Sequence, residues 1–480
     1  MKKILFVASE AIPFIKTGGL ADVTGSLVRY IDRQEYDVRI ILPKYACMDE
    51  NWKRKLRFHS HFYVSLGWRN QYVGILETVE GGIHYYFVDN EYYFAGPQPY
   101  NQLHEDIEKF AYFSKAALAA VDMIDFVPDV IHCHDWQTAM VPVFLKAFAQ
   151  DYPLLRRTKT VLTIHNLRFQ GRWLMDAIKN LTGLPDSYFT PDKLESYGEA
   201  NFLKGGIVYA DALTTVSPTY ALEIMTQEGG ESLDGLLYAR KNSLYGIING
   251  VDSADYDPNH DMYLVHNFGI ADMEEGKAAN KTALQRELNL TEDADTILIG
   301  MVTRITDQKG FDLIACVLDE LLANARVQLV VLGTGEERYV NMLRGFAEKY
   351  PEKLSANIYY SEQMAHRIYA SSDAFLMPSL FEPCGLSQLM SFCYGTLPIV
   401  RETGGLKDTV LPYNEYDHTG TGFSFANFHA QEMLRTIYYA MHIYYDDRAS
   451  WNEMARRDMR LDFSWKKSAR EYEKVYERLL

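Results

Sequence analysis

The chain carries nearly the same short motif near its two ends, Thr-Gly-Gly-Leu-Ala-Asp at residues 17–22 and Thr-Gly-Gly-Leu-Lys-Asp at residues 403–408. Each copy follows a short apolar run, at residues 4–8 and 397–400, and precedes a segment expected to be helical. A glycine pair at a loop-to-helix junction lets backbone N–H groups approach an anion, and the helix dipole adds favourable potential there. The repetition therefore predicts two similar α/β halves, each presenting a helix N-terminus to one phosphorylated ligand.

Length and composition indicate a large soluble protein with two or more domains. Its 480 residues are enough for two hydrophobic cores. The formal charge of −16 disfavours a nucleic acid or an anionic membrane as partner. The five cysteines form no Cys-x-x-Cys pair, which fits a reducing compartment, and no segment approaches the roughly 20 apolar residues of a spanning helix. We therefore expect a cytoplasmic protein that binds neither nucleic acid nor membrane.

Short β-branched runs alternate with helical patterns along both halves, which is typical of parallel sheets built from β-α-β units. The acidic, turn-rich segment 252–275 interrupts this alternation, and we expect the chain to cross between domains there. The charged end, residues 465–480, has a helical pattern. The expected strands are 4–8, 37–42, 84–88, 130–133, 161–164, 212–216, 244–248, 297–303, 328–332, 374–377 and 397–400, and helices are expected at 104–123 and 136–149.

The strongest chemical signal follows the strand expected at 297–303. Arg304 and Lys309 lie in the loop after it, before a helix expected near Gly310. Ligands of open α/β sheets bind beyond the carboxyl ends of strands, and a guanidinium fork together with an ammonium suits a departing diphosphate. Glu382 follows another expected strand and offers a carboxylate to sugar hydroxyls. These residues together favour a phosphate and sugar site over a solvated basic loop.

Two strand ends in the first half carry histidines. His132 and His134 alternate along a strand and would share one face, but a zinc site would need further ligands, and none is evident at a compatible spacing. We expect instead that Asp135 emerges at the strand end to face a crevice. His165 also ends a strand, where a structural and a catalytic role both stay open.

Two other residues carry weaker signals. Cys384 has no His or Asp near it in sequence, so we interpret it as a packing residue rather than a nucleophile. Gly333 belongs to a Gly-Thr-Gly turn after an expected strand, which by itself is weak evidence of a phosphate loop.

Six motifs follow one another in a recognisable order across nearly the whole chain. They resemble those of the bacterial glycogen synthases and plant starch synthases, which are retaining glucosyltransferases with the GT-B fold. The combination of the first and last motifs is highly specific. The motifs are Lys-Thr-Gly-Gly-Leu at 16–20, His-Cys-His-Asp-Trp at 132–136, Thr-Ile-His-Asn at 163–166, Gly-Ile-Ile-Asn-Gly-Val-Asp at 246–252, Arg304 with Lys309, and Glu-Pro-Cys-Gly-Leu at 382–386.

The resemblance implies an α/β fold of two Rossmann-like domains that face each other across a cleft. Residues 1–251 would form the glucan acceptor side, residues 252–462 the nucleotide-sugar donor side, and residues 463–480 a helix that returns to the N-terminal domain. The implied reaction transfers glucose from ADP-glucose to the non-reducing end of an α-1,4-glucan with retention of configuration. No cofactor or metal ion is implied, because fixed cations and helix dipoles meet the developing charge.

The resemblance also implies individual roles. Arg304 and Lys309 would stabilise the departing diphosphate, His165 would lie beside the transferred glucose, Glu382 would bind donor hydroxyls, and Asp135 would serve the acceptor side. Tyr100 ends an aromatic loop that begins at residue 92 and that we expect to hold a glucan end. The implied donor-binding residues are Lys16, Gly18, Gly19, Asn249, Gly333, Tyr360 (against the base), Cys384, Gly385, Leu386, Thr403, Gly404 and Gly405.

Several alternatives stay open. The chain could be another GT-B glucosyltransferase that uses UDP-glucose and a small acceptor. It could also be a catalytically silent glucan-binding protein of the same fold, although glucan binding alone would not require a diphosphate clamp. A phosphorylase is less favoured because no pyridoxal-phosphate lysine segment is recognisable. One departure from the family pattern is Glu402, which precedes Thr403 where the family commonly has a basic residue.

Overall fold

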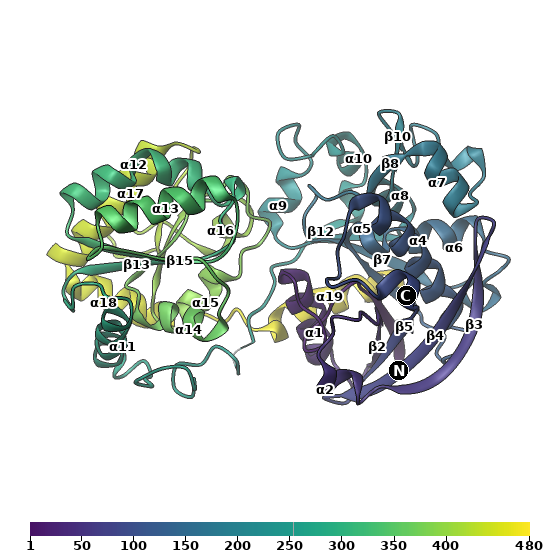
Figure 1. Cartoon of the computed structure of the whole chain (residues 1–480), viewed down its shortest axis with the longest axis horizontal. Helices are drawn as coiled ribbons and strands as arrows, with labels where there is room; N and C mark the ends of the chain where they lie inside the picture. Colours follow the sequence, from purple (N-terminus) through teal and green to yellow (C-terminus); the bar gives the residue numbers. More distant parts are fainter. Residues whose placement is uncertain (253) are drawn as a thin grey trace. The chain divides into compact units, whose positions relative to one another are not determined.

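A computed structural model describes residues 1–252 and 254–480, which form two compact units (Figure 1). Unit 1 contains Met1–Asn249 and Trp465–Leu480, and unit 2 contains Gly250–Ser464. Each unit has its own sheet and its own hydrophobic core, so the expected α/β fold class is confirmed. The expected crossing segment, residues 252–275, lies in unit 2, and its residue 253 lies outside the described residues.

Within the described residues, unit 1 has a large sheet and a small one. The large sheet has nine strands in the order β12-β11-β7-β6-β1-β2-β5-β4-β3, and the small one has the order β8-β10-β9. The bounds are β1 Lys2–Val7, β2 Tyr36–Pro43, β3 Arg57–Leu66, β4 Arg69–Glu80, β5 Ile83–Asp89, β6 Val130–His134, β7 Lys159–Ile164, β8 Arg172–Leu174, β9 Glu195–Ser196, β10 Glu199–Asn201, β11 Ala212–Thr215 and β12 Leu244–Gly246.

Strand β1 is the point at which the large sheet changes its direction of winding. It pairs in parallel with β2 on one side and with β6 on the other. Ligands of open α/β sheets bind at such a switch point, beyond the carboxyl ends of the strands. The ends of β1, β6 and β7 therefore define the place in unit 1 where a ligand is expected.

Helices cover both faces of the large sheet of unit 1 (Figure 1). α6 packs against both α4 and α8, and α1 packs against α19. The bounds are α1 Gly19–Tyr30, α2 Glu50–Lys53, α3 Glu91–Phe94, α4 Leu103–Ala120, α5 Asp135–Thr138, α6 Met140–Ala147, α7 Met175–Thr182, α8 Phe202–Tyr209, α9 Pro218–Glu223, α10 Asp234–Ala239 and α19 Trp465–Leu479, with 3-10 turns at Pro153–Leu155, Asp186–Tyr188 and Lys241–Ser243.

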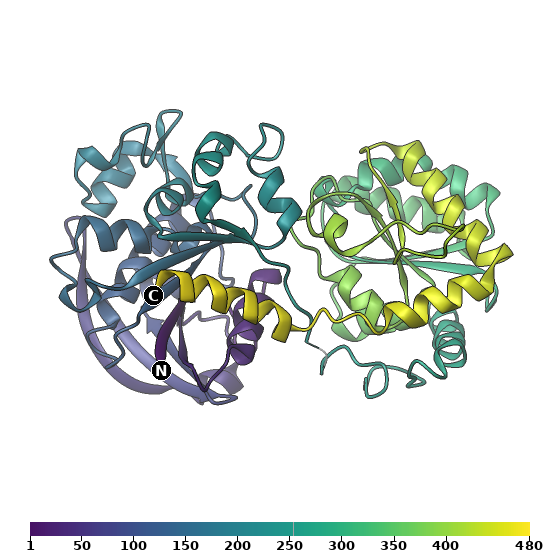
Figure 2. The same cartoon turned by 180° about the vertical axis from the view of Figure 1, so that it is seen from behind.

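The C-terminal helix α19 is part of the core of unit 1. Its apolar side chains recur at helical spacing, which gives it one apolar face. Trp465, Tyr472 and Tyr476 on that face are buried, and they belong to the same core cluster as α1. Figure 2 shows α19, in yellow, lying beside α1. Helices at the two ends of the chain, α1 and α19, are thus packed together.

Within the described residues, unit 2 has a six-stranded parallel sheet in the order β15-β14-β13-β16-β17-β18. β13 is its switch strand, because β14 pairs with it on one side and β16 on the other. The bounds are β13 Ile297–Val302, β14 Val327–Leu332, β15 Leu354–Asn357, β16 Ala374–Met377, β17 Leu397–Arg401, β18 Phe423–Phe425, α11 Met273–Glu287, α12 Phe311–Asn324, α13 Glu337–Lys349, α14 Glu362–Ser371, α15 Ser387–Cys393, α16 Gly404–Thr409, α17 Ala430–Asp446 and α18 Arg448–Asp458, with a 3-10 turn at Asp307–Lys309.

The expected strands are all present, with ends shifted by at most two residues. The structure adds β3 and β4, which form an antiparallel edge between residues 57 and 80, where no strand was expected. Most of their residues are exposed or only partly buried, unlike the continuous apolar runs of buried parallel strands. The short strands β8, β9, β10, β15 and β18 were also missed. The helix expected at 136–149 is two helices, α5 and α6, which meet at Ala139.

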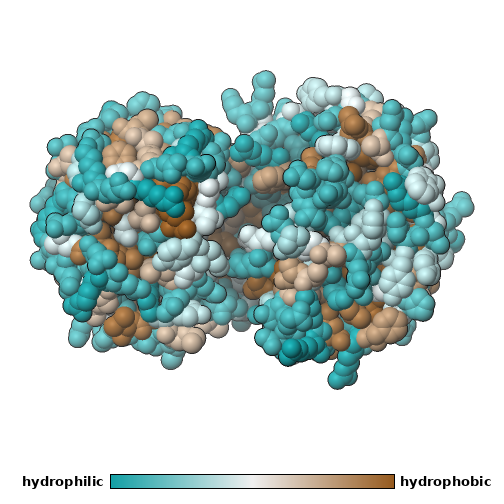
Figure 3. Space-filling view, viewed as in Figure 1, coloured by the Kyte–Doolittle hydropathy of each residue, from teal (hydrophilic) through white to brown (hydrophobic). Residues whose placement is uncertain are grey.

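The surface of each unit is predominantly polar. Figure 3 shows hydrophilic residues over most of the visible face of each unit, with hydrophobic residues in scattered patches. No helix within the described residues is long and apolar enough to cross a membrane.

Candidate active site

The predicted site residues of unit 2 gather where β13 and β16 end. Nζ of Lys309 lies 2.5 Å from Oε2 of Glu382, although the two residues are 73 positions apart. The hydroxyl of Ser379 donates to the same carboxylate oxygen at 2.9 Å. The side chains of Lys309 and Glu382 are 16% and 8% exposed, so this ion pair is largely removed from water. An ammonium and a carboxylate thus stand side by side at the switch point, where a phosphate and a hydroxyl group of one ligand can each find a partner.

Two glycines allow the loops of this site to approach one another closely. Gly310 has φ +79°, and a Cβ there would clash with the carbonyl oxygen of Pro378, so the loop after β13 packs directly on the loop after β16. Gly404 has φ +45°, and a Cβ there would clash with the carbonyl oxygen of Glu382. The N–H of Gly405 donates to that same oxygen at 3.2 Å. The Thr-Gly-Gly motif of α16 is therefore built onto the Glu-Pro-Cys-Gly segment.

A cavity of about 50 Å³ lies at the carboxyl ends of β13 and β16. Polar groups of Thr303, Lys309, Ser379, Glu382 and Ser387 line it, together with apolar residues of both strands. Gly385 and Leu386, both predicted donor-binding residues, belong to the same lining. The site thus combines an apolar floor with a few convergent polar groups, which is the usual character of a small-molecule site.

The other predicted residues of unit 2 lie around this group. Arg304 is exposed, and its Nη2 lies 3.4 Å from Oε1 of Gln308. Gly333 follows β14, and its N–H donates to the carbonyl oxygen of Asn357 at 3.0 Å. Tyr360 follows β15 and is 74% exposed.

Three more residues of unit 2 are buried or take part in hydrogen bonds within the unit. Cys384 is buried, and its carbonyl oxygen accepts from Nε2 of Gln388 at 3.0 Å. Thr403 is buried at the N-terminus of α16. The carboxylate of Glu402 accepts from the hydroxyl of Ser424 at 2.8 Å, so the residue that departs from the family pattern has a partner of its own.

In unit 1, Asp135 and His165 meet at the carboxyl ends of β6 and β7. Oδ1 of Asp135 accepts from the backbone N–H of His165 at 2.7 Å. Asp135 has φ +55°, a left-handed conformation that non-glycine residues rarely adopt and that concentrates at functional sites. Burial raises the pKa of its carboxyl to about 7, although the N–H groups of His165 and Asn166 oppose that shift. Burial lowers the pKa of His165 to about 3, so its imidazole is neutral.

Two further histidines, His132 and His134, lie beside this pair. The rings of His132 and His134 are stacked with centroids 4.3 Å apart, as their alternation on one strand predicts. Nδ1 of His134 lies 3.0 Å from Nε2 of His165. His132 bonds the hydroxyls of Thr163 at 2.6 Å and of Tyr476 at 2.8 Å. No group of three or more His, Cys, Asp or Glu side chains among residues 1–252 and 254–480 is arranged to hold a metal ion.

Glu10 is a site residue that sequence reasoning missed. It follows β1 at the switch point, is 3% exposed, and accepts from the N–H of Thr17 at 2.5 Å and from the hydroxyl of Thr17 at 2.9 Å. The hydroxyl of Tyr100 donates to it at 3.0 Å and also lies 2.8 Å from Oγ of Ser9. Burial raises the pKa of Glu10. The available signal was an acidic residue two positions beyond the strand expected at 4–8.

The first glycine of the N-terminal motif, Gly18, has open space around it, whereas the corresponding Gly404 packs against a backbone carbonyl oxygen. Gly18 is the N-cap of α1, and a Cβ there would meet no atom within 4 Å. Gly19 begins the helix, and Nζ of Lys16 pairs with Asp22 at 2.7 Å. Asn249, the last residue of the main segment of unit 1, is buried, and its Oδ1 has no hydrogen-bond partner.

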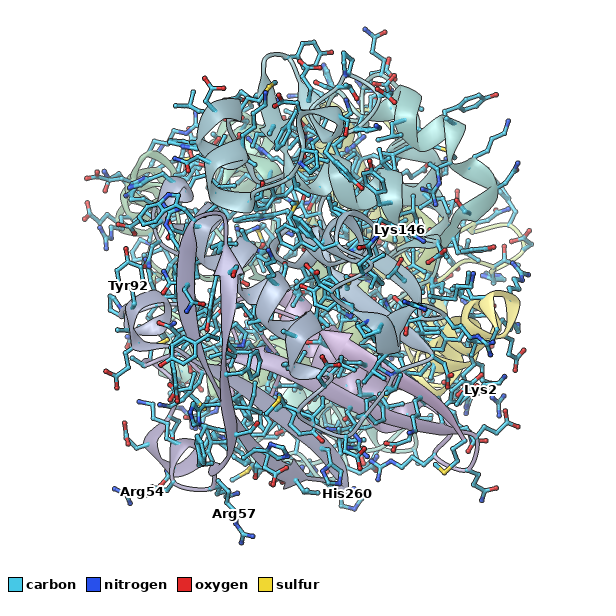
Figure 4. All side chains as sticks on the ribbon, turned by 90° about the vertical axis from the view of Figure 1, so that its right-hand side faces the viewer. Lys2, Arg54, Arg57, Tyr92, Lys146 and His260 are labelled. Atoms are coloured by element: carbon cyan, nitrogen blue, oxygen red, sulfur yellow. The ribbon has the colours of Figure 1, made fainter. Side chains whose placement is uncertain are left out.

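The aromatic segment before Tyr100 is mostly core, not an open loop. Residues Glu91–Phe94 form helix α3, in which Tyr93 and Phe94 are buried. Tyr92 is 79% exposed and points away from the protein (Figure 4). The expectation of an aromatic loop is therefore wrong for two of its three leading residues, because their rings pack against α4, with Tyr93 stacked on Tyr112 at 4.4 Å.

Two family models match successive parts of the chain, and close relatives match it over its full length. Residues 3–239 match the starch synthase catalytic domain, and residues 284–458 match the glycosyl transferases group 1. The glycogen synthase of Lachnospira eligens is 57% identical over 479 residues, with 100% of both chains covered. That of Geobacillus stearothermophilus is 48% identical over 478 residues, with 100% of this chain and 98% of the relative covered.

Two solved structures are also similar. The catalytic domain of starch synthase IV from Arabidopsis thaliana, bound to ADP and acarbose, is 32% identical, has a TM-score of 0.91, and is matched over 100% of this chain and 99% of that one. Sucrose-phosphate synthase from Thermosynechococcus elongatus is 16% identical with a TM-score of 0.62 over 100% of this chain and 99% of that one, which shows a shared fold alone. The resemblance expected from the motifs is confirmed, and the chain belongs to the family of bacterial glycogen synthases and plant starch synthases, the GT-B glucosyltransferases of glycogen and starch synthesis.

Proposed function

We propose that this enzyme transfers glucose from ADP-glucose to the non-reducing end of an α-1,4-glucan with retention of configuration, in the cytoplasm and without a cofactor. The observation that carries the proposal is the largely buried pair of Lys309 and Glu382, with its 2.5 Å contact, at the switch point of unit 2. A neutral glucan needs no such ammonium, whereas a departing diphosphate does. The pair therefore favours a transferase over a silent glucan-binding protein.

In this proposal the ligand separates Lys309 from Glu382, and each side chain then binds the ligand in place of the other. Lys309 turns to the phosphate oxygens, and Glu382 then accepts from glucose hydroxyls. Arg304, which is exposed in the loop after β13, supplies a second cation to the leaving diphosphate. We also assign Thr403 and Gly404, at the N-terminus of α16, to the phosphates, where the helix dipole favours negative charge. Because these charges are in place before the bond breaks, they stabilise the transition state without reorganisation.

The residues of unit 1 receive the sugar-directed roles. His165, whose imidazole is neutral, serves as a hydrogen-bonding group beside the transferred glucose. Asp135 serves the acceptor side, and Lys16 with Gly18 and Gly19 approaches the phosphates and the acceptor. Tyr100 supports this loop through Glu10.

We propose ADP-glucose rather than UDP-glucose as the donor. The support is the starch synthase IV structure, which holds ADP and acarbose in a chain 32% identical to this one. Tyr360, 74% exposed after β15, is the residue we assign to the adenine ring, which offers a larger face than uracil for stacking. A pocket shaped for adenine should therefore bind uracil less well.

The test is to supply labelled ADP-glucose and UDP-glucose separately with glycogen and to measure incorporation. We expect catalytic efficiency with ADP-glucose to exceed that with UDP-glucose by about 10- to 100-fold, the effect of roughly 1–3 kcal/mol of lost contact. Equal or better use of UDP-glucose would overturn the donor assignment. Glycogen binding without incorporation from either donor would overturn the transferase proposal in favour of a glucan-binding protein.

A further inference from the structure

The buried histidine beside His165 decides which nitrogen of His165 is available to a ligand. We infer that His134 is a positioning residue that holds His165 in the tautomer with its proton on Nδ1, so that His165 offers the substrate a hydrogen-bond donor. The inference deepens the proposed function and rests on it for the nature of that substrate. It follows from a hydrogen bond and from one nitrogen that lacks a partner.

The geometry around His134 is asymmetric. Nδ1 of His134 lies 3.0 Å from Nε2 of His165. Nε2 of His134 is buried and has no hydrogen-bond partner. The ring is held between His132, with centroids 4.3 Å apart, and Phe6, with centroids 5.4 Å apart, and its backbone N–H donates to the hydroxyl of Thr138. This packing leaves the ring of His134 little freedom to turn toward another acceptor.

Each imidazole of the pair carries a single proton. Burial lowers the pKa of His165 to about 3 and the pKa of His134 well below its ordinary value. The shared hydrogen bond can then be made in two ways. If Nε2–H of His165 donates, the proton of His134 is on its own Nε2, where it is buried without an acceptor. If Nδ1–H of His134 donates, Nε2 of His134 carries no proton, and only an acceptor lone pair is left without a partner.

The second arrangement is favoured because buried N–H groups are very rarely left unpaired, whereas unpaired acceptors are somewhat more common. Nε2 of His165 then accepts, and its own proton is on Nδ1. His165 is a partly exposed residue, and its Nε2 is occupied by His134, so Nδ1–H is the group left for a ligand. Its partner must be an oxygen with a free lone pair, such as a glucose hydroxyl. His165 in this state donates a hydrogen bond and does not act as a base.

The experiment uses the full chain with 15N-labelled histidine and reads the tautomer of His165 by NMR, with His165→Ala to assign its signals. His134→Phe keeps a ring that can stack on Phe6 but cannot donate. His134→Asn keeps a donor at the position of Nδ1. The matched control is Tyr476→Phe, which removes the hydrogen bond between Tyr476 and His132 and leaves the bond to His165 intact.

We expect the Nδ1–H tautomer of His165 in the wild type, in His134→Asn and in Tyr476→Phe, and its loss in His134→Phe. In His134→Phe, kcat/KM for ADP-glucose should fall by about tenfold, equivalent to about 1.4 kcal/mol, while the Kd for ADP, which lacks glucose, stays unchanged. His134→Asn should recover most of that loss.

An Nε2–H tautomer in the wild type, or an unchanged tautomer and activity in folded His134→Phe, would overturn the inference. So would an equal loss of activity in Tyr476→Phe, because the effect would then be general to the histidine stack. A wild-type protein without glucosyl transfer would refute the proposed function alone, since the tautomer is read on the free protein.

Discussion

Replacing Lys309 with alanine tests whether its ammonium stabilises the leaving diphosphate. Nζ of the side chain lies 2.5 Å from Glu382, and the side chain is only 16% exposed. Water therefore has little access to the site to take over the stabilising interaction of the ammonium. Removing one preorganised group of this kind lowers kcat by about 10²- to 10³-fold, or roughly 3 kcal/mol. We therefore expect at least a hundredfold loss of kcat, with little change in glycogen binding.

The same change also affects stability, which the assay must separate from catalysis. Without Lys309, the carboxylate of Glu382 keeps the hydroxyl of Ser379 as a donor but is left without its cation. Leaving one member of a buried pair unpaired costs about 3–5 kcal/mol of unfolding free energy. The double variant Lys309→Met with Glu382→Gln removes both charges, so it should recover much of this stability but none of the activity.

Initial rates of glucose incorporation at saturating ADP-glucose, together with urea unfolding, measure the two effects. The control is Lys349→Ala, which removes another lysine of unit 2 that pairs with Asp319 at 2.5 Å but is 55% exposed. It should leave both quantities nearly unchanged. A folded Lys309→Ala protein with kcat within about threefold of the wild type would refute the assignment, since a preorganised charge at the leaving group is worth far more.

Three further predictions concern the loops of the site. The pKa of Asp135 is about 7 in the folded protein against 3.8 ordinarily, so between these values the folded state holds a proton that the unfolded state releases, and stability is lost as pH rises from about 4 to about 7. Urea unfolding should therefore show the free energy of unfolding of Asp135→Asn rising relative to that of the wild type across this pH range. A difference that stays constant with pH would contradict the shift. Gly404→Ala should lower the unfolding free energy by about 2 kcal/mol or more, because φ +45° and a clashing backbone oxygen exclude a Cβ, whereas Gly18→Ala, with open space around it, should change thermal stability little. Glu10→Gln should lower kcat and cost about 1–3 kcal/mol of stability, because the amide N–H would face the N–H and hydroxyl groups of Thr17 that donate to the carboxylate. Unchanged unfolding and kinetics would show that Glu10 does not hold the loop at Thr17 in place.

Local patterns were sufficient for the framework of both units. Continuous apolar runs such as residues 329–332 and 374–377 predict buried parallel strands, and glycine pairs mark the helix starts at Gly19 and Gly404. The sequence did not predict β3, which lies at the edge of the sheet, or its neighbour β4. Most of their residues are exposed or only partly buried, which makes their patterns polar and ambiguous.

The motifs of the site were visible in the sequence, but their pairings were not. Lys309 and Glu382 could each be placed at a strand end, yet their contact depends on β13 and β16 being neighbours, which is a result of how the sheet winds. Glu10 has no distinctive motif, and its role exists only because the chain turns back to bring Thr17 and Tyr100 to it.

The sequence alone thus determined the residue types, the strand ends and the family, because these depend on short stretches of chain and on the order of motifs. Only the tertiary structure decided which of these groups share a hydrogen bond, which glycine is packed and which is open, and which histidine nitrogen is left without a partner. Such features depend on sheet order and on backbone approach between segments far apart in the sequence. Two copies of one motif show this directly, since Gly404 is packed against a carbonyl oxygen while Gly18 is surrounded by open space.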